Sequence, residues 1–379
     1  MVFLTPMTID MLFYLTDSLI VEEADHRFGQ IKRAVYHLAI QAANGNHAVI
    51  GDIKAISHFR AVLQTDFVAG PYFNKIHQNI AFEVVPSFLK YYVEVVLDAP
   101  STRIENDTTI VQVNYSQLIP LESTNKTSLV CEFLNDAEFY AYVLRWFSRQ
   151  NGANVHFAFN SIDGGGTNMD QNIQKELDAH HITLAIVDTD CRYPSSPINP
   201  QGTYGKCIGI GAGNVLFRLV PLEVHELENL IPLNFIDQEF SNRTNNDAEY
   251  ARKKIAFDYL RKDAEHILPY YDYKKGIKNT LEYRNKPELQ TFARTCYELN
   301  DDKMATQPDF NVFISTVPDK GYVYTELIGG TGIINMTIEM IKNGNAPEPT
   351  LYNFQRNNWN KIGQEMLNWC FARRPEAIH

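Results

Sequence analysis

The chain has 379 residues, of which 45% are apolar and 21% charged, and it carries a formal net charge of −11. This composition is typical of a globular protein with enough chain for two or three domains. An acidic chain without a Lys/Arg-rich run argues against tight, unaided, non-specific nucleic-acid binding, because such binding depends on neutralising phosphates. Nucleic acid that is presented by a partner, or reached through a local basic patch, stays compatible with this charge.

The five cysteines are scattered and form no Cys-x-x-Cys pair, which favours a reducing compartment over a disulfide framework or a zinc knuckle. The N-terminal stretch has no basic segment, and Asp10 and Asp17 interrupt its apolar residues. No run of about 18 apolar residues is present. We therefore expect a cytoplasmic protein without a signal peptide or a membrane span.

Residues 1–126 are expected to form a mainly helical N-terminal region. Apolar residues recur at helical spacing around 31–39, 55–63 and 82–95. Thr109–Asn114 is a short β-like segment, either a hairpin element or the edge of the next sheet. The histidines of this region are evenly spread, so a packing or partner-binding role is favoured over a metal cluster.

From residue 127 the pattern becomes an alternation of strands and helices. The expected elements are, in chain order, a strand at Ser128–Phe133, a helix opened by Asn135 and Asp136, a strand at Val155–Phe159, a helix at Met169–His180, a strand at Ile182–Asp190 and a strand at Val215–Val220. This order is typical of right-handed βαβ units. We therefore predict an α/β domain over 127–235 with a mostly parallel sheet. Its last segment, 221–232, is acidic and reads as a helix start closed by Pro232.

The remainder, 236–379, is expected to be a second mainly helical region. Its last part, at about 357–372, has the spacing of an amphipathic helix.

Acidic side chains stand at the carboxyl ends of the expected strands. Glu132 lies near the end of the first, and Asp188 and Asp190 end the third, where period-two alternation would point both to the same side. Because ligands of open α/β sheets bind at this edge, we expect the three carboxylates to lie together. Carboxylates held that close repel each other unless a proton or a cation lies between them.

Two further carboxylates would complete the cluster. Asp136 follows Glu132 by four residues across a tight turn, and Glu228 follows the fourth strand. Oxygen ligands without His or Cys favour Mg²⁺ or Mn²⁺ over zinc. Such a cluster suits phosphoryl transfer, in which the metal activates a water and stabilises the leaving oxygen.

Each of these features also has a simpler explanation. A lone Asp-x-Asp pair occurs in sugar-nucleotide transferases, phosphatases and exposed turns. Gly164–Gly166 is either a flexible turn or a place where backbone approaches phosphate closely. Glu223, Glu226 and Glu228 would also suit a solvated helix face or the start of a helix. The order of the acids along successive strands, more than any single residue, favours a metal site.

At this level of detail the chain resembles a known family. Leu129–Asp136, a strand ending in Glu132 followed by a turn carrying Asp136, resembles the first motif of the topoisomerase–primase (Toprim) domain, although Phe133 stands where the family usually has glycine. Ile186–Asp190 resembles the Asp-x-Asp motif of that domain. The glycine-rich turn and Glu226–Asn229 look more like the Toprim nucleases of the OLD (overcoming lysogenization defect) group and their relatives in prokaryotic antiviral systems.

The resemblance covers about 127–232 and implies a Toprim-like Rossmannoid domain between the two helical regions. It implies a nuclease that uses Mg²⁺ or Mn²⁺ to cleave DNA or RNA in an antiphage defence system. The implied metal ligands are Glu132, Asp136, Asp188, Asp190 and Glu228. Among these, Glu132, Asp188 and Asp190 are also the catalytic candidates, Glu132 as the base for the attacking water. Lys274, with Lys275 close behind, is the candidate for the downstream lysine of that group. Arg192 and Tyr193, together with Gly165 and Gly166, would contact the substrate.

No Walker A motif is present, so an ATPase or sensor that accompanies such a nuclease would be a separate protein. We also consider a homo-oligomer. Two other functions stay open from the residues. One is a regulatory or binding module with a degenerate Toprim domain, which the acidic charge and Phe133 favour. The other is a metal-dependent nucleotidyl transferase of the primase type, or a glycosyl transferase.

Overall fold

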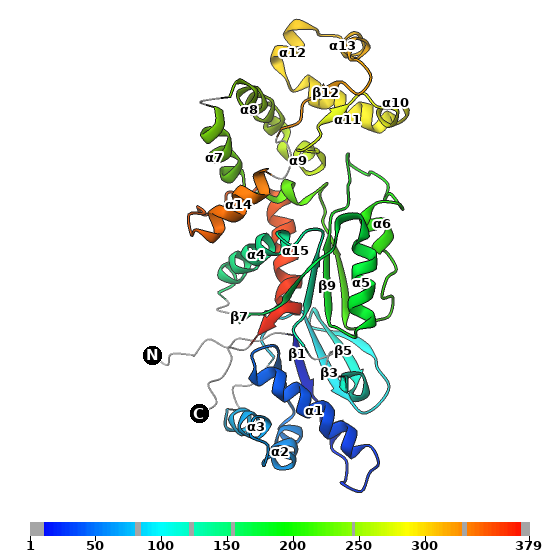
Figure 1. Ribbon diagram of the computed structural model, residues 1–379, viewed down its shortest axis with the longest axis vertical. Helices are drawn as coiled ribbons and strands as arrows, with labels where there is room; N and C mark the ends of the chain where they lie inside the picture. The colour runs from blue at the N-terminus through cyan, green and yellow to red at the C-terminus, as the bar shows by residue number, and fades with distance from the viewer. Residues whose placement is uncertain are drawn as a thin grey trace. The chain divides into compact units, whose positions relative to one another are not determined.

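The computed structural model describes residues 11–79, 85–120, 125–152, 156–244, 247–327 and 332–372. The chain forms two compact units. Unit 1 comprises residues 1–186, 209–220 and 361–379, and unit 2 comprises residues 187–208 and 221–360. Unit 1 is built around two sheets, whereas the described part of unit 2 is mostly helical (Figure 1).

The first part of unit 1 is a five-stranded sheet in the order β2-β1-β3-β5-β4, in which β4 alone is antiparallel to its neighbour. Its strands are β1 (Leu12–Leu15), β2 (Ala48–Gly51), β3 (Tyr91–Val96), β4 (Thr102–Glu105) and β5 (Thr108–Asn114). Asn106 and Asp107 join β4 to β5 with φ of 48° and 60°, the backbone that tight hairpin turns require. The N-terminal region therefore contains, beside its helices, a five-stranded sheet that the sequence does not predict.

Helices accompany this sheet where two of the three apolar stripes predicted them. They are α1 (Phe28–Ala43), α2 (Ile53–Val62) and α3 (Ala69–Gln78), with the short 3₁₀ helices η1 (Asp17–Leu19) and η2 (Tyr115–Leu118). The third predicted stripe, 82–95, is wrong: residues 80–84 lie outside the described residues, and β3 begins at Tyr91. The short central strands are buried on both sides and lack clear alternation, so their apolar residues also fit a helical period.

The second sheet of unit 1 has the order β10-β9-β6-β8, and β6 pairs in parallel with both β8 and β9. Its strands are β6 (Ser128–Cys131), β8 (Asn160–Asp163), β9 (Thr183–Val187) and β10 (Phe217–Pro221). α4 (Asp136–Gln150) connects β6 to β8, and the 3₁₀ turn η4 (Gly166–Asn168) and α5 (Met169–Asp178) connect β8 to β9. These two connections cross the sheet in opposite directions, so right-handed crossovers place α4 and α5 on opposite faces, as Figure 1 shows. The predicted α/β architecture with a mostly parallel sheet is confirmed.

The second strand of this sheet is not the one that the sequence predicts. Val155 lies outside the described residues, and β7 (His156–Phe157) pairs with β13 (Phe371–Ala372) rather than with β6. The strand beside β6 is Asn160–Asp163 at the edge of the sheet. Its side chains are mostly exposed, and a polar edge strand carries no apolar run that a sequence pattern could reveal.

Unit 2 contains many short helices around a two-stranded element. Its strands are β11 (Ile277–Lys278) and β12 (Tyr322–Tyr324), and its α-helices are α6 (Thr203–Cys207), α7 (Leu233–Thr244), α8 (Ala248–Leu260), α9 (Ala264–Ile267), α10 (Leu281–Asn285), α11 (Pro287–Glu298), α12 (Asp301–Thr306), α13 (Phe310–Thr316) and α14 (Gly332–Lys342). The 3₁₀ helices are η5 (Leu227–Leu230), η6 (Arg261–Asp263) and η7 (Leu268–Tyr270). Buried aromatic rings form part of its core, with Tyr271 and Tyr324 6.0 Å apart between centroids.

The closing helix α15 (Asn353–Cys370) begins a few residues before the amphipathic stretch that predicts it, and it contributes to both units. In unit 2, the side chains of Gln355 and Trp359 hydrogen-bond the backbone of 229–231. In unit 1, the ring of Trp369 stacks on Tyr91 of β3 at 5.0 Å between centroids. Among the helices of the described residues, none combines the length and the apolarity that crossing a membrane requires.

Candidate functional site

Unit 1 places two acidic residues at the carboxyl ends of neighbouring strands. Glu132 comes directly after β6, rather than inside the strand as predicted, and Asp163 is the last residue of β8. The register pairs Cys131 with Asp163, so the two strands end at the same level of the sheet. Asp163 is exposed and its carboxylate accepts a hydrogen bond from the amide of Gly165 at 2.8 Å. Sequence reasoning missed Asp163 because it misplaced this strand.

The glycine-rich turn after β8 folds back onto the end of β6. The amides of Gly164 and Gly166 donate to the carbonyl oxygens of Cys131 and Glu132, at 2.7 and 3.1 Å. A Cβ on Gly164 would overlap the Cys131 carbonyl oxygen, and Gly166 has a φ of +57°. The turn is therefore a specific structure and needs glycine for two different reasons, close backbone approach and left-handed backbone.

Phe133 and Asp136 have defined structural roles beside this turn. Phe133 is 54% exposed, and its ring lies about 4 Å from where a Cβ on Gly166 would stand. A carboxylate oxygen of Asp136 accepts the amide hydrogen of Phe133 at 2.9 Å, and Asp136 is buried as the first residue of α4. One carboxylate oxygen of Asp136 therefore stabilises the turn and the helix start.

The Asp-x-Asp pair belongs to unit 2, in the segment that follows β9. The strand ends at Val187, and Asp190 has a φ of +56°, so the alternation expected to align Asp188 with Asp190 does not apply to these residues. Asp190 is exposed, whereas Asp188 is partly buried. This correction has a local cause: a residue with left-handed backbone does not continue the extended pleat of a strand.

The segment after β10 lies beside the Asp188–Asp190 segment. The Thr189 hydroxyl donates to the carbonyl oxygen of Val224 at 2.7 Å, and the Asp190 amide donates to that of His225 at 3.0 Å. The predicted acidic helix over 221–232 is wrong, since only the 3₁₀ turn Leu227–Leu230 forms there. In the observed conformation of this segment, Glu226 and Glu228 are buried and do not lie on a solvated helix face.

Asn229 fixes the acidic segment to a third segment of unit 2. Its side-chain amide donates to the carbonyl oxygens of Leu268 and Tyr271 at 2.7 and 2.9 Å, and its oxygen accepts the Glu226 amide hydrogen at 2.9 Å. Asn229 is fully buried. The amide of His225 also donates to the carbonyl oxygen of Pro269 at 2.7 Å. These bonds hold residues 225–229 against the chain that leads into Lys274.

Lys274 joins the two buried glutamates. Its ammonium lies 2.8 Å from Glu228 Oε1 and 3.2 Å from Glu226 Oε2. Burial and the neighbouring Glu228 carboxylate raise the pKa of Glu226 to about 7. Burial alone would lower the pKa of Lys274, but the two carboxylates outweigh it and raise that pKa. The cluster therefore attracts positive charge or a proton more strongly than isolated glutamates would.

A second buried pair adjoins this cluster. His225 Nε2 lies 3.4 Å from Asp272 Oδ2, and both side chains are less than a tenth exposed. Burial would raise the pKa of Asp272, but the hydrogen bond and charge of His225 outweigh it, so that pKa is lowered. His225, Glu226 and Asp272 offer ligand atoms that lie within 4.8 Å of one another.

Two buried polar atoms of this group lack a hydrogen-bond partner among the described residues, His225 Nδ1 and Glu226 Oε1. A buried polar atom without a partner is costly, so it indicates a missing cation, proton or water. One imidazole with two carboxylates suits Mn²⁺ or another transition metal better than Mg²⁺. His225, Glu226 and Asp272 therefore form a ligand set that suits a divalent metal, and this set differs from the all-oxygen set that the sequence predicts.

The structure thus brings part of the predicted site together in unit 2. The Asp188–Asp190 segment, Glu228 and Lys274 lie on three connected segments, whereas Glu132, Asp136, Gly165 and Gly166 belong to unit 1. The two proposed substrate contacts differ: Arg192 is 40% exposed and pairs with Glu282 at 2.7 Å, whereas Tyr193 is buried.

Sequence reasoning missed four residues of the assembled cluster, Glu226, His225, Asp272 and Asn229, as participants in a site. The sequence contains two features that point to these residues. His225 directly precedes Glu226 and lies three residues before Glu228, and Asp272 lies two residues before Lys274. Neither feature joins 225–229 to 272–274, because only tertiary hydrogen bonds do so. Comparison with known proteins adds no relative, since no family model, no curated protein and no solved structure matches the chain.

Proposed function

We propose that this protein is a divalent-metal-dependent phosphodiesterase that cleaves DNA or RNA, with a Toprim-like catalytic arrangement. The observation that carries the proposal is the buried cluster of Glu226, Glu228 and Lys274 beside the Asp188–Asp190 segment. Closely spaced carboxylates with a lysine between them suit the binding of a metal ion and of a phosphate group that gains negative charge during hydrolysis.

The residues divide into three roles. Asp188, Asp190 and Glu228 would hold Mg²⁺ or Mn²⁺, and His225, Glu226 and Asp272 offer a set better suited to Mn²⁺. A bound divalent ion supplies an activated water and a Lewis acid for the phosphate oxygens. Lys274 would shift from the glutamates toward the phosphate, where its positive charge is most useful as negative charge develops. Glu132, at the end of β6, is the candidate base in unit 1.

The resemblance to OLD-group nucleases extends the proposal to an effector of antiphage defence that works with a separate ATPase or sensor. The missing Walker A motif supports this division of labour. Co-purification with the products of neighbouring genes tests it, and a nuclease that is fully active alone and binds none of them would contradict it.

The enzymatic proposal is tested with purified full-length protein, labelled single-stranded DNA, double-stranded DNA and RNA, and either Mg²⁺ or Mn²⁺. We expect Asp190→Asn, Glu228→Gln and Glu132→Ala each to lower the cleavage rate by about 100-fold or more, as loss of a transition-state contact does. Glu326→Gln is the matched control, since Glu326 pairs with the buried Lys253 at 3.1 Å elsewhere in unit 2. Equal cleavage by the unchanged protein, the three site variants and the control would indicate a contaminating nuclease and would contradict the proposal.

Two other outcomes would replace the proposal with a different function. Calorimetry that finds no divalent-metal binding, together with retained partner association, would favour a regulatory module. Release of pyrophosphate or a nucleoside diphosphate from a labelled donor, without hydrolysis of nucleic acid, would favour nucleotidyl or glycosyl transfer.

A further inference from the structure

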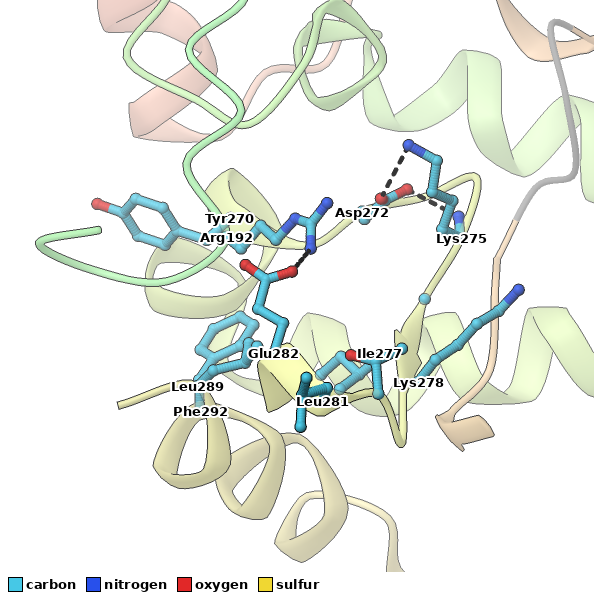
Figure 2. A pocket seen from close by; sticks show the side chains of 12 residues that line it. Arg192, Tyr270, Asp272, Lys275, Ile277, Lys278, Leu281, Glu282, Leu289 and Phe292 are labelled. Carbon is cyan, nitrogen blue, oxygen red and sulfur yellow. Dashed lines mark hydrogen bonds and ion pairs between the residues drawn. The ribbon is translucent and has the colours of Figure 1, made fainter. Parts of the chain in front are cut away.

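A cavity of about 350 Å³ lies in unit 2, next to the acidic cluster. Its lining comes from the segment after β9 and from 270–292, and Figure 2 shows the side chains. Asp272 lines it and also pairs with His225, so the cavity and the cluster share one residue. A volume near the lower end of the range for small-molecule sites, roughly 300–1,000 Å³, suits one nucleotide-sized ligand.

One side of the cavity is apolar. In Figure 2 the side chains of Ile277, Leu281, Leu289 and Phe292 gather on the same side. Leu281 is 69% exposed, whereas Leu289 and Phe292 are 6% exposed. A wall with an aromatic ring and an uncovered leucine favours a ligand with a flat, apolar face, because stacking and burial both stabilise it.

Cationic side chains slightly outnumber carboxylates in the lining of the cavity. Arg192, Lys275 and Lys278 line it against two carboxylates, Asp272 and Glu282, in a chain whose net charge is −11. Glu282 is already paired with Arg192 at 2.7 Å and with Lys286 at 2.9 Å. Lys275 is 70% exposed, and its ammonium lies as far as 4.0 Å from the nearest carboxylate oxygen of Asp272. The ammonium is therefore available to an anion.

The backbone directs neighbouring lysines to two different places. Asp272 Oδ1 accepts the amide hydrogens of Lys274 and Lys275 at 3.1 and 2.7 Å, and Gly276 closes the turn with a φ of +59°. A Cβ on Gly276 would come within 2.6 Å of the backbone of β12 and its following residues, so this turn is closely packed against them. Lys274 consequently reaches the glutamates, whereas Lys275 lines the cavity.

We infer that this cavity is a binding site for a nucleoside phosphate, with the base against Leu281 and Phe292 and the phosphate at Lys275. The ligand is either a free mononucleotide or one nucleotide of a strand, since both present the same chemistry. The second case builds on the proposed function, because the shared Asp272 would place that nucleotide next to the acidic cluster.

The test measures binding to the full-length protein by calorimetry in buffer with EDTA, so that it does not depend on hydrolysis. The probes are AMP, ATP, inorganic pyrophosphate and a tetranucleotide with phosphorothioate linkages. We expect dissociation constants to rise at least tenfold in Lys275→Ala and in Leu281→Glu. Val312→Glu is the matched control, since Val312 is an exposed apolar residue of α13 that does not line this cavity.

Each outcome decides between the possibilities. Tetranucleotide binding at least tenfold tighter than AMP assigns the cavity to a strand, and equal affinities assign it to a free mononucleotide. Equal affinity for pyrophosphate and for the nucleotides would overturn the role of the apolar wall. Absence of binding by every probe, or equal binding in all variants, would overturn the inference, even if the protein proves to be a nuclease.

Discussion

The ammonium of Lys274 lies 2.8 Å from Glu228 and 3.2 Å from Glu226, and thereby holds two buried carboxylates together. Without it, burial and mutual repulsion would favour either a protonated glutamate or an open segment. The lysine is 28% exposed, so its ammonium can exchange partners without the cluster unfolding. This combination of pairing and access is what the proposed binding of a cation and a phosphate at the cluster requires.

Replacing Lys274 with methionine keeps most of the side-chain volume and removes the charge. Since a buried charge is left without its partner, we expect the free energy of unfolding at pH 7.5 to fall by about 2–4 kcal/mol, measured by urea denaturation. Lys275→Met is the matched control, because Lys275 is 70% exposed and its nearest carboxylate is 4.0 Å away. We expect about 0–0.5 kcal/mol for the control. Similar losses in both variants would show that Lys274 stabilises nothing specific.

The raised pKa of Glu226 predicts a pH dependence of stability. Its folded-state pKa of about 7 lies above the ordinary value of 4.5, so the folded state binds the proton more tightly than the unfolded state. This contribution to stability is fully present below pH 4.5 and is lost as the pH rises through 7.

Glu226→Gln mimics the protonated glutamate at every pH. In buffer with EDTA, we expect its stability relative to the unchanged protein to increase between pH 4.5 and 7 by about 2–3 kcal/mol, measured by urea denaturation at several pH values. Titrating groups that do not interact with Glu226 cancel in this difference. A difference that stays constant across this range would show that Glu226 has an ordinary pKa.

Asn229 is predicted to be the main anchor of the acidic segment. Asn229→Ala removes three side-chain hydrogen bonds at a fully buried position, and we expect a loss of about 3 kcal/mol in the free energy of unfolding. Asn279→Ala serves for comparison, because the Asn279 side-chain amide makes one bond, to the carbonyl oxygen of Val317 at 2.8 Å. Its expected loss is about 1 kcal/mol. Equal losses would mean that the segment is held by other contacts.

The glycine turn beside Glu132 is predicted to reject a methyl group. Gly164→Ala would overlap the Cys131 carbonyl oxygen, and we expect a loss of about 2–3 kcal/mol in thermal or urea unfolding. Gly152→Ala is the control, since it has a φ of +63° but no atom within 4 Å of an added Cβ. Only backbone strain of about 1 kcal/mol is expected there. If Gly164→Ala lowers the free energy of unfolding no more than the control does, the turn is not in close contact with the end of β6.

The amino-acid sequence by itself determined the elements whose patterns are local. The apolar stripes of α1, α2 and α4 and the apolar runs of β6 and β9 are read within windows of a few residues, and the order of these elements implies a parallel sheet. Glu132 and Asp188 directly follow β6 and β9, as their place after apolar runs suggests. The same reasoning failed for β3 and β8, because a short buried strand and a polar edge strand carry no distinct period.

Only the tertiary structure decided which side chains share a site. His225 and Asp272 are separated by 47 positions, yet the bonds of Asn229 to Leu268 and Tyr271 bring their segments together. Burial then turns Glu226 from an ordinary surface acid into one with a pKa near 7. Long-range hydrogen bonds and desolvation depend on what surrounds a residue in space, and no window of sequence contains that information.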